Sequence, residues 1–171
     1  MKVKHISIAV DPEQTGNPVF GAPADLTAYI LEPVEGITDK KRPAVLLCPG
    51  GGYHKLSGRE DQPIAMKYLA AGFHVFVLHY SLVPDVFPRA LMELALSMKL
   101  IREHGNEWNV DVKRIAVSGF SAGGHLACCL GTFWNKEWLY KALEVKPEMI
   151  QPNGMILCYP VITSEEYCHK G

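Results

Sequence analysis

Residues 114–127 read RIAVSGFSAGGHLA, and this stretch decides the fold. Its first half is an apolar, β-prone run typical of a buried strand, and an apolar helix pattern follows it. Between the two lies Ser121, at the centre of a Gly-x-Ser-x-Gly motif whose glycines are Gly119 and Gly123. A strand that turns abruptly into a helix exposes the turn residue above the carboxyl end of the sheet, where open α/β sheets bind ligands. We therefore expect Ser121 in a strained turn for which the two glycines make room.

The sequence CPGGGY, residues 48–53, is a second signal, because it directly follows the apolar run PAVLLC and so marks a strand end. Three consecutive glycines let the backbone approach a ligand closely and turn its N–H groups inward. In a serine hydrolase such a loop supplies oxyanion donors, and the N–H of Ala122, at the start of a helix, is another candidate. A flexible turn is the plain alternative. A phosphate-binding loop is not supported, because no Gly-Lys-Ser/Thr follows.

The rest of the chain alternates between strand and helix patterns. Strands are expected at residues 2–10, 26–33, 43–49, 74–80, 114–120 and 153–161, and helices at 61–73, 87–105 and 123–134. Residues 10–23, rich in Pro, Gly and Asn, are expected to form a loop. This order predicts an α/β fold with a mostly parallel sheet, helices on both faces, and the first two strands as an antiparallel edge. We expect residues 1–171 to form a single, partial domain.

Composition and charge exclude several kinds of partner. Of the 171 residues 48% are hydrophobic and 20% charged, as in globular proteins, and the net charge of −1 favours neither nucleic acid nor a membrane surface. No signal-peptide pattern is present, and no window has the roughly 18 apolar residues of a spanning helix. The cysteine count of five is odd, and four members lie in apolar runs: Cys48, Cys128, Cys129 and Cys158. We expect these to be buried thiols in a reducing compartment, and hence a cytoplasmic protein.

The order of these motifs resembles the α/β-hydrolase superfamily, and is most similar to small bacterial esterases of the hormone-sensitive-lipase-like and acetyl-xylan-esterase-like groups. The match runs from about Pro43 to Ile162. CPGGGY stands where many relatives carry His-Gly-Gly-Gly, with Pro49 in place of the histidine, and HYSL has Ser81 where relatives often have arginine.

The resemblance implies hydrolysis of carboxylic esters through an acyl-enzyme, with short acyl groups, acetyl groups on sugars among them. It implies that Ser121 is the nucleophile and that the oxyanion donors are Gly51, Gly52 and Ala122. The substrate would be a small-molecule ester, and neither a cofactor nor a metal is expected.

The base that a serine nucleophile needs is harder to place. In this fold the order along the chain is Ser, then Asp or Glu, then His, but only the 50 residues 122–171 follow Ser121. His125 is expected to point along its helix, and His169 comes too early for the histidine of the family. His54, beside the glycine loop, is a further candidate, although such a residue more often only lines the pocket.

We therefore expect the front part of a hydrolase, inactive by itself, in which the last two strands with the acid and the base are missing. A sheet that stops there leaves a parallel edge strand uncovered, so we expect instability or a homo-oligomer formed through that edge. The alternative is a non-catalytic binding module that uses the oxyanion pocket for small anionic or acyl ligands.

Two further groups of residues have competing interpretations. Trp134, Trp138 and Tyr140 either line an acyl pocket or pack under a loop. A metal site built from Cys158, Cys168 and His169 matches no zinc spacing, and a core thiol with a surface tail explains them more simply.

Overall fold

A computed structural model describes residues 1–34, 36 and 40–163. Its strands are β1 (Lys2–Ile8), β2 (Ala24–Ile30), β3 (Arg42–Cys48), β4 (His74–His79), β5 (Val110–Phe120) and β6 (Gly154–Cys158). They form one sheet in the order β1-β2-β4-β3-β5-β6. The strands from β4 to β6 are parallel, whereas β1 and β2 pair antiparallel at one edge. The predicted α/β fold and its antiparallel edge are confirmed.

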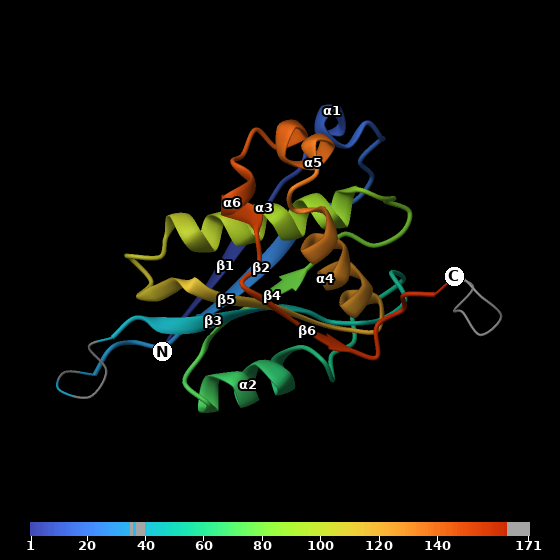
Figure 1. The fold of residues 1–171 in the computed structure, drawn as a ribbon. Helices are drawn as coiled ribbons and strands as arrows, with labels where there is room; N and C mark the ends of the chain where they lie inside the picture. The colour runs from blue at the N-terminus through green and yellow to red at the C-terminus, as the bar shows by residue number, and fades with distance from the viewer. Residues whose placement is uncertain (35, 37–39, 164–171) are drawn as a thin grey trace.

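Helices cover both faces of the sheet (Figure 1). One face carries α2 (Gln62–Ala70), and the other carries α3 (Arg89–Glu103) and α4 (Ala122–Phe133). Three short helices were not predicted: α1 (Pro12–Thr15), α5 (Glu137–Ala142) and α6 (Pro147–Ile150). They are too short to show a helical period, and α1 lies in a stretch whose prolines and glycines favoured a loop.

The central strands are apolar on both faces because the sheet is covered on both sides. In β3, Leu46 packs in the large core under α3 and α4, whereas Leu47 packs against α2 on the other face. The same alternation places Phe76 of β4 on the first side and Val77 on the second. The continuous apolar runs that predicted these strands therefore reflect two cores, one on each face.

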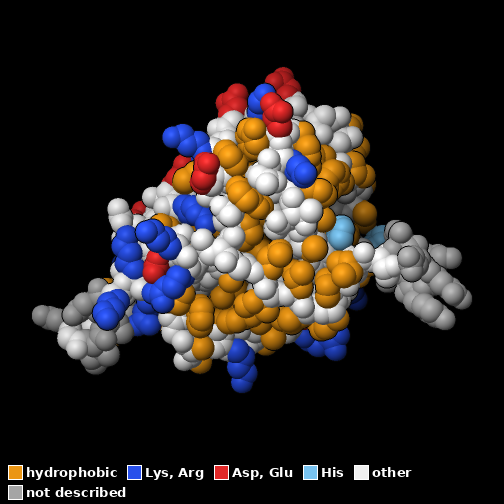
Figure 2. Space-filling view, in the orientation of Figure 1, with side chains coloured by type: hydrophobic (Ala, Val, Ile, Leu, Met, Phe, Trp, Pro, Cys, Tyr) orange, Lys and Arg blue, Asp and Glu red, His pale blue; other side chains and the backbone are white. Residues whose placement is uncertain are grey.

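Strand β6 is the edge of the described sheet opposite β1, and in this part of the chain it pairs only with β5. Its Met155 and Ile156 are 48% and 38% exposed. Figure 2 shows hydrophobic side chains spread over β6 and α4, while Lys and Arg side chains gather where β3 and β5 begin. The uncovered parallel edge is thus seen in the described residues, whereas pairing with a second copy stays a prediction.

The burial of the cysteines differs in part from the prediction. Cys48 is fully buried, but Cys128, Cys129 and Cys158 are only partly buried, because α4 and the edge strand β6 leave one side open. All four are free thiols. No described helix is both long and apolar enough to cross a membrane.

Candidate active site

Ser121 occupies the turn between β5 and α4, as the sequence predicted. Its backbone angles are φ 51° and ψ −117°, a conformation that side-chain-bearing residues rarely adopt. The Ser121 N–H donates to the carbonyl of Cys158 at 3.0 Å, and the Ser121 carbonyl accepts the N–H of His125 at 2.9 Å. The turn is therefore held both by the next strand and by the first turn of the helix.

Gly119 and Gly123 are needed because backbone segments meet at this turn. A Cβ at Gly119 would lie 2.1 Å from the carbonyl oxygen of Gly123, and a Cβ at Gly123 would lie 2.1 Å from that of Cys48. The first contact is local to the turn, as expected. The second joins the turn to the end of β3, so Gly123 also allows the glycine loop to sit beside Ser121.

The glycine loop follows β3 and bends back toward Ser121. Gly51 has φ +135°, and a Cβ there would lie 2.0 Å from the carbonyl oxygen of Lys55. In the described part of the chain, no group accepts a hydrogen bond from the N–H of Gly51 or Gly52. Ala122 is the first residue of α4, where the N–H has no acceptor within the helix. All three residues line the same cavity as Ser121.

Glu60 ties the glycine loop to the segment after β6. Its carboxylate accepts the N–H of Gly50 at 2.8 Å and the hydroxyl of Tyr159 at 2.6 Å. This hydrogen bond raises the pKa of Tyr159 to about 12. Glu60 therefore fixes the glycine loop, whereas its neighbour Asp61 pairs with His79 Nε2 at 2.6 Å.

Tyr53 ties the other side of the glycine loop to α4. Its hydroxyl lies 2.8 Å from His125 Nδ1, and its carbonyl accepts the N–H of Val83 at 2.9 Å. Burial raises the pKa of Tyr53 and lowers that of His125, so both side chains are neutral near pH 7. A Tyr directly after three glycines was visible in the sequence, but its partner 72 residues away was not.

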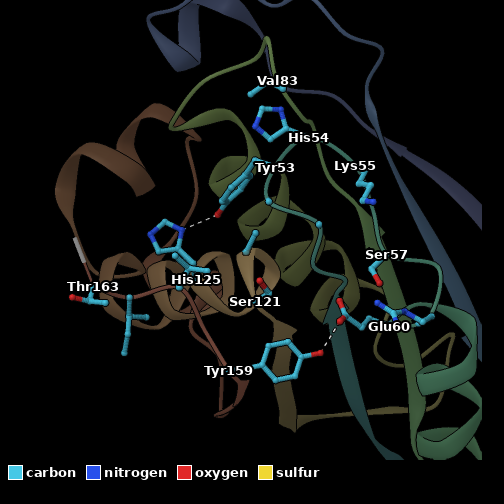
Figure 3. A pocket seen from close by; sticks show the side chains of 16 residues that line it. Tyr53, His54, Lys55, Ser57, Glu60, Val83, Ser121, His125, Tyr159 and Thr163 are labelled. Atoms are coloured by element: carbon cyan, nitrogen blue, oxygen red, sulfur yellow. Dashed lines mark hydrogen bonds between the residues drawn. The ribbon is translucent and has the colours of Figure 1, made fainter. Parts of the chain in front are cut away.

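These elements enclose a cavity of about 710 Å³ (Figure 3). Ser121 lies between the two anchored sides of the loop, with Tyr53 and His125 on one side and Glu60 and Tyr159 on the other. The remaining wall is mixed: Lys55, Ser57, Arg59 and Thr163 are polar, whereas Val83, Val161 and Ile162 are apolar.

The described residues place no side chain in hydrogen bond contact with the Ser121 hydroxyl. His125 Nδ1 faces Tyr53 and its Nε2 lies 3.5 Å from Cys129 Sγ, one turn along the helix, as expected. His54 lines the cavity near Val83 and does not contact Ser121 (Figure 3). His169 lies outside the described residues.

The aromatic residues after α4 do not line this cavity. Trp134 and Tyr140 pack against the core, and Trp138 contacts Phe87 and Phe133. The packing interpretation therefore holds for Trp134 and Tyr140. Within residues 1–34, 36 and 40–163, no cluster of His, Cys, Asp and Glu could hold a metal, and Cys168 and His169 lie outside this range.

A mixed sheet with a serine in the turn from a strand to a helix defines the α/β-hydrolase class. Solved structures of esterases from this class are similar to this chain. A carboxylesterase from Lactobacillus plantarum is 32% identical, with a TM-score of 0.77 over 95% of this chain and 57% of that one. An acetyl ester-xyloside bifunctional hydrolase from Caldicellulosiruptor lactoaceticus is 29% identical, with a TM-score of 0.78 over 98% of this chain and 60% of that one.

Within this class the chain belongs to the BD-FAE family, whose model matches residues 33–156. It is 32% identical to endo-1,4-beta-xylanase B of Butyrivibrio fibrisolvens over 88% of this chain. It is 30% identical to an acetylxylan esterase of Xylanibacter ruminicola over 72% of this chain. The chain spans 23% of the length of each of these two relatives.

Proposed function

We propose that this chain carries the nucleophile and the oxyanion site of a carboxylic ester hydrolase. The observation that carries the proposal is that the strained turn at Ser121 lines one cavity with Gly51, Gly52 and Ala122, whose N–H groups have no acceptor among the described residues. Two of these donors come from the loop after β3 and the third from the start of α4.

In the proposed reaction, Ser121 Oγ attacks the ester carbonyl carbon while a base takes its proton. The carbonyl oxygen becomes an oxyanion that accepts hydrogen bonds from the three N–H groups, and each such donor typically contributes roughly 3 kcal/mol to the transition state. Collapse releases the alcohol, which takes up the proton, and leaves an acyl-Ser121 ester. Water then attacks this ester and releases the acid.

The base and its orienting acid are proposed to come from outside residues 1–34, 36 and 40–163. Both ring nitrogens of His125 face other side chains, and His54 does not contact the serine. A serine hydroxyl without a base is a weak nucleophile at neutral pH. His169, the one histidine outside the described residues, comes too early along the chain for the histidine of the family, so we expect residues 1–171 alone to be inactive as an esterase.

The proposed substrates are esters of short acyl groups, with acetylated sugars as the first choice. Two names among the relatives support this, an acetylxylan esterase and an acetyl ester-xyloside hydrolase. The hydroxyl, carboxylate and cationic side chains around Ser121 suit an alcohol with several hydroxyl groups.

A binding module without catalysis is the second candidate. It is favoured by the lack of a base among the described residues at Ser121. Such a module would use the same three N–H groups to hold a small anion or an acyl carbonyl.

A fluorophosphonate probe separates the two candidates when it is applied to the protein isolated from its native source, with the intact mass measured first. We expect a covalent adduct on the peptide that contains Ser121, and its loss in Ser121→Ala. Ser118→Ala is the matched control, because Ser118 lies on β5, three residues before Ser121, and is fully buried, so its loss should leave labelling intact. A folded protein that shows no adduct between pH 6 and 10 would favour the binding module.

A further inference from the structure

Two cationic side chains, Lys55 and Arg59, line the cavity at Ser121, and both come from the loop that follows the three glycines. Figure 3 shows Lys55 on the side of Ser121 opposite to His125. Both cations are exposed to solvent, and in the described part of the chain no carboxylate forms an ion pair with either of them. Their charges are therefore available to a ligand in the cavity.

Two contacts fix where these cations lie along the wall. The stem of Lys55 passes Gly51, because a Cβ built on Gly51 would lie 3.2 Å from Lys55 Cγ. Arg59 lies near Tyr159, since the hydrogen bond to Glu60 raises the pKa of Tyr159 and the charge of Arg59 opposes this rise. One cation thus stands beside the proposed oxyanion loop and the other beside the segment after β6.

Glu60 is the one carboxylate in the described wall, and both of its oxygens are already used. Its Oε2 accepts the N–H of Gly50 at 2.8 Å, and its Oε1 accepts the hydroxyl of Tyr159 at 2.6 Å. Because Lys55 and Arg59 stand against this single acid, the wall carries an excess of positive charge, whereas the whole chain has a net charge of −1. A local excess of this sign attracts an anionic ligand.

The donors on this wall suit a carboxylate. A guanidinium such as that of Arg59 binds a carboxylate through two parallel hydrogen bonds, and an ammonium such as that of Lys55 adds a point charge. The Ser57 hydroxyl also lines the cavity and has no hydrogen bond partner among the described residues, so it is a third donor. A neutral hydroxyl group in the same place would gain hydrogen bonds but no charge attraction.

We propose that this wall binds a carboxylate on the alcohol side of the ester, so that the preferred substrates are acyl esters of sugars that carry a uronic acid. The proposal rests on the proposed function, in which Ser121 attacks the ester carbonyl and the alcohol is a sugar. It adds to that function a negative charge on the sugar, which Lys55 and Arg59 recognise.

The test measures binding and does not need turnover. The Ser121→Ala form of the full chain is titrated with methyl β-D-glucuronide and methyl β-D-glucoside, which differ only in a carboxylate against a hydroxymethyl group, and amide NMR shifts are followed. At low salt we expect the glucuronide to bind about fivefold more tightly, with the largest shifts in residues 51–60. At about 0.5 M salt the difference should fall below about twofold, because exposed charges are screened. Equal affinities at low salt would overturn the proposal.

Acetate is the third probe, because it carries a carboxylate without a sugar ring. We expect it to bind more weakly than the glucuronide, since it lacks the sugar hydroxyl groups. If acetate binds as tightly as the glucuronide, the wall is a general anion site and the assignment to acidic sugars is wrong.

Lys55→Gln and Arg59→Gln each remove one charge at an exposed position and should each weaken glucuronide binding about twofold, while the glucoside is unaffected. The double variant should bind both sugars equally. Lys113→Gln is the matched control, because Lys113 is also exposed but lies near the start of β5, at the opposite end of that strand from Ser121, and it should change neither affinity. If Lys55→Gln fails to fold, Arg59→Gln alone should show the twofold loss.

A preference for the glucuronide that survives in the variants would also overturn the proposal. Failure of the proposed function would show separately, as a missing fluorophosphonate adduct on the native protein together with an intact preference for the glucuronide. Equal affinities for the two sugars with a normal adduct at Ser121 would refute the acidic-sugar site alone.

Discussion

Two charged networks support the loops around Ser121, and they are built in opposite ways. On the α3 side Arg89 lies between Asp85 and Glu93, and all three side chains are at most 3% exposed. On the α2 side His79 lies between Asp61 and Asp25, whose side chains are 22% and 39% exposed. The first network holds the loop that contains Val83, and the second holds the start of α2, just after the glycine loop.

Burial makes the members of the first network depend on one another. For Asp85, burial raises the pKa, but hydrogen bonds from Phe20, Arg89 and Gly21 outweigh it and the net pKa is lowered. For Glu93, burial dominates and the pKa is raised despite hydrogen bonds from Ser81. Removing one buried charge leaves the others uncompensated, whereas water replaces a lost partner in the second network.

The largest expected effect is that of Arg89→Met. It leaves two buried carboxyl groups without their cation, so the free energy of unfolding should fall by about 3–5 kcal/mol. Urea unfolding of the variant and the wild type measures this fall in the free energy of unfolding. Arg114→Met is the control, because Arg114 also pairs with an aspartate, Asp111, but is 58% exposed, and its loss should stay below about 1 kcal/mol. Equal losses would contradict the contrast between the networks.

The same substitution in both networks gives the next largest effect. Asp85→Asn removes a charge that faces Arg89 and accepts two backbone N–H groups, and should lower stability by about 2–3 kcal/mol. Asp61→Asn, at the partly exposed pair with His79, should change stability by less than about 1 kcal/mol. Thermal unfolding of the two variants, measured side by side, compares these two losses of stability. A larger loss for Asp61→Asn than for Asp85→Asn would show that burial does not set the difference between the networks.

The smallest effect is a pH dependence from His79. Its hydrogen bond to Asp61 raises the pKa above the ordinary value of 6.5. The pair should therefore stabilise the fold fully below pH 6.5 and lose this contribution as the pH rises through the folded-state pKa. After discounting for solvent screening, the difference between wild type and His79→Gln should be below about 1 kcal/mol. Unfolding curves from pH 5 to 9 should show this difference shrinking with pH, and a difference that grows would refute the assignment.

The sequence predicted the central part of the fold well, because local pattern and packing agree there. The run before Ser121 is apolar on both faces, the turn needs glycine on both sides, and an apolar helix follows. These three signals all predict the same strand–turn–helix unit. The short helices at 12–15 and 147–150 were not predicted, since four residues cannot show a period.

The hydrogen bonds that support the site could not be predicted from local sequence patterns. Tyr53 and His125 are joined across 72 residues, and Glu60 and Tyr159 across 99. Neither pair leaves a periodic trace in the sequence. Asp85 lies in the loop before α3, and its i,i+4 spacing to Arg89, with that of Arg89 to Glu93, was the sequence signal of the buried network.

The backbone at position 121 also bears on how such a sequence can change over time. With φ at 51° and ψ at −117°, serine is strained by about 1–3 kcal/mol where glycine would be relaxed. Fold stability alone thus favours Ser121→Gly, and only a requirement for the hydroxyl opposes it, which is a trade-off between stability and activity confined to one residue. Descendants released from that requirement are expected to drift to glycine at this position first.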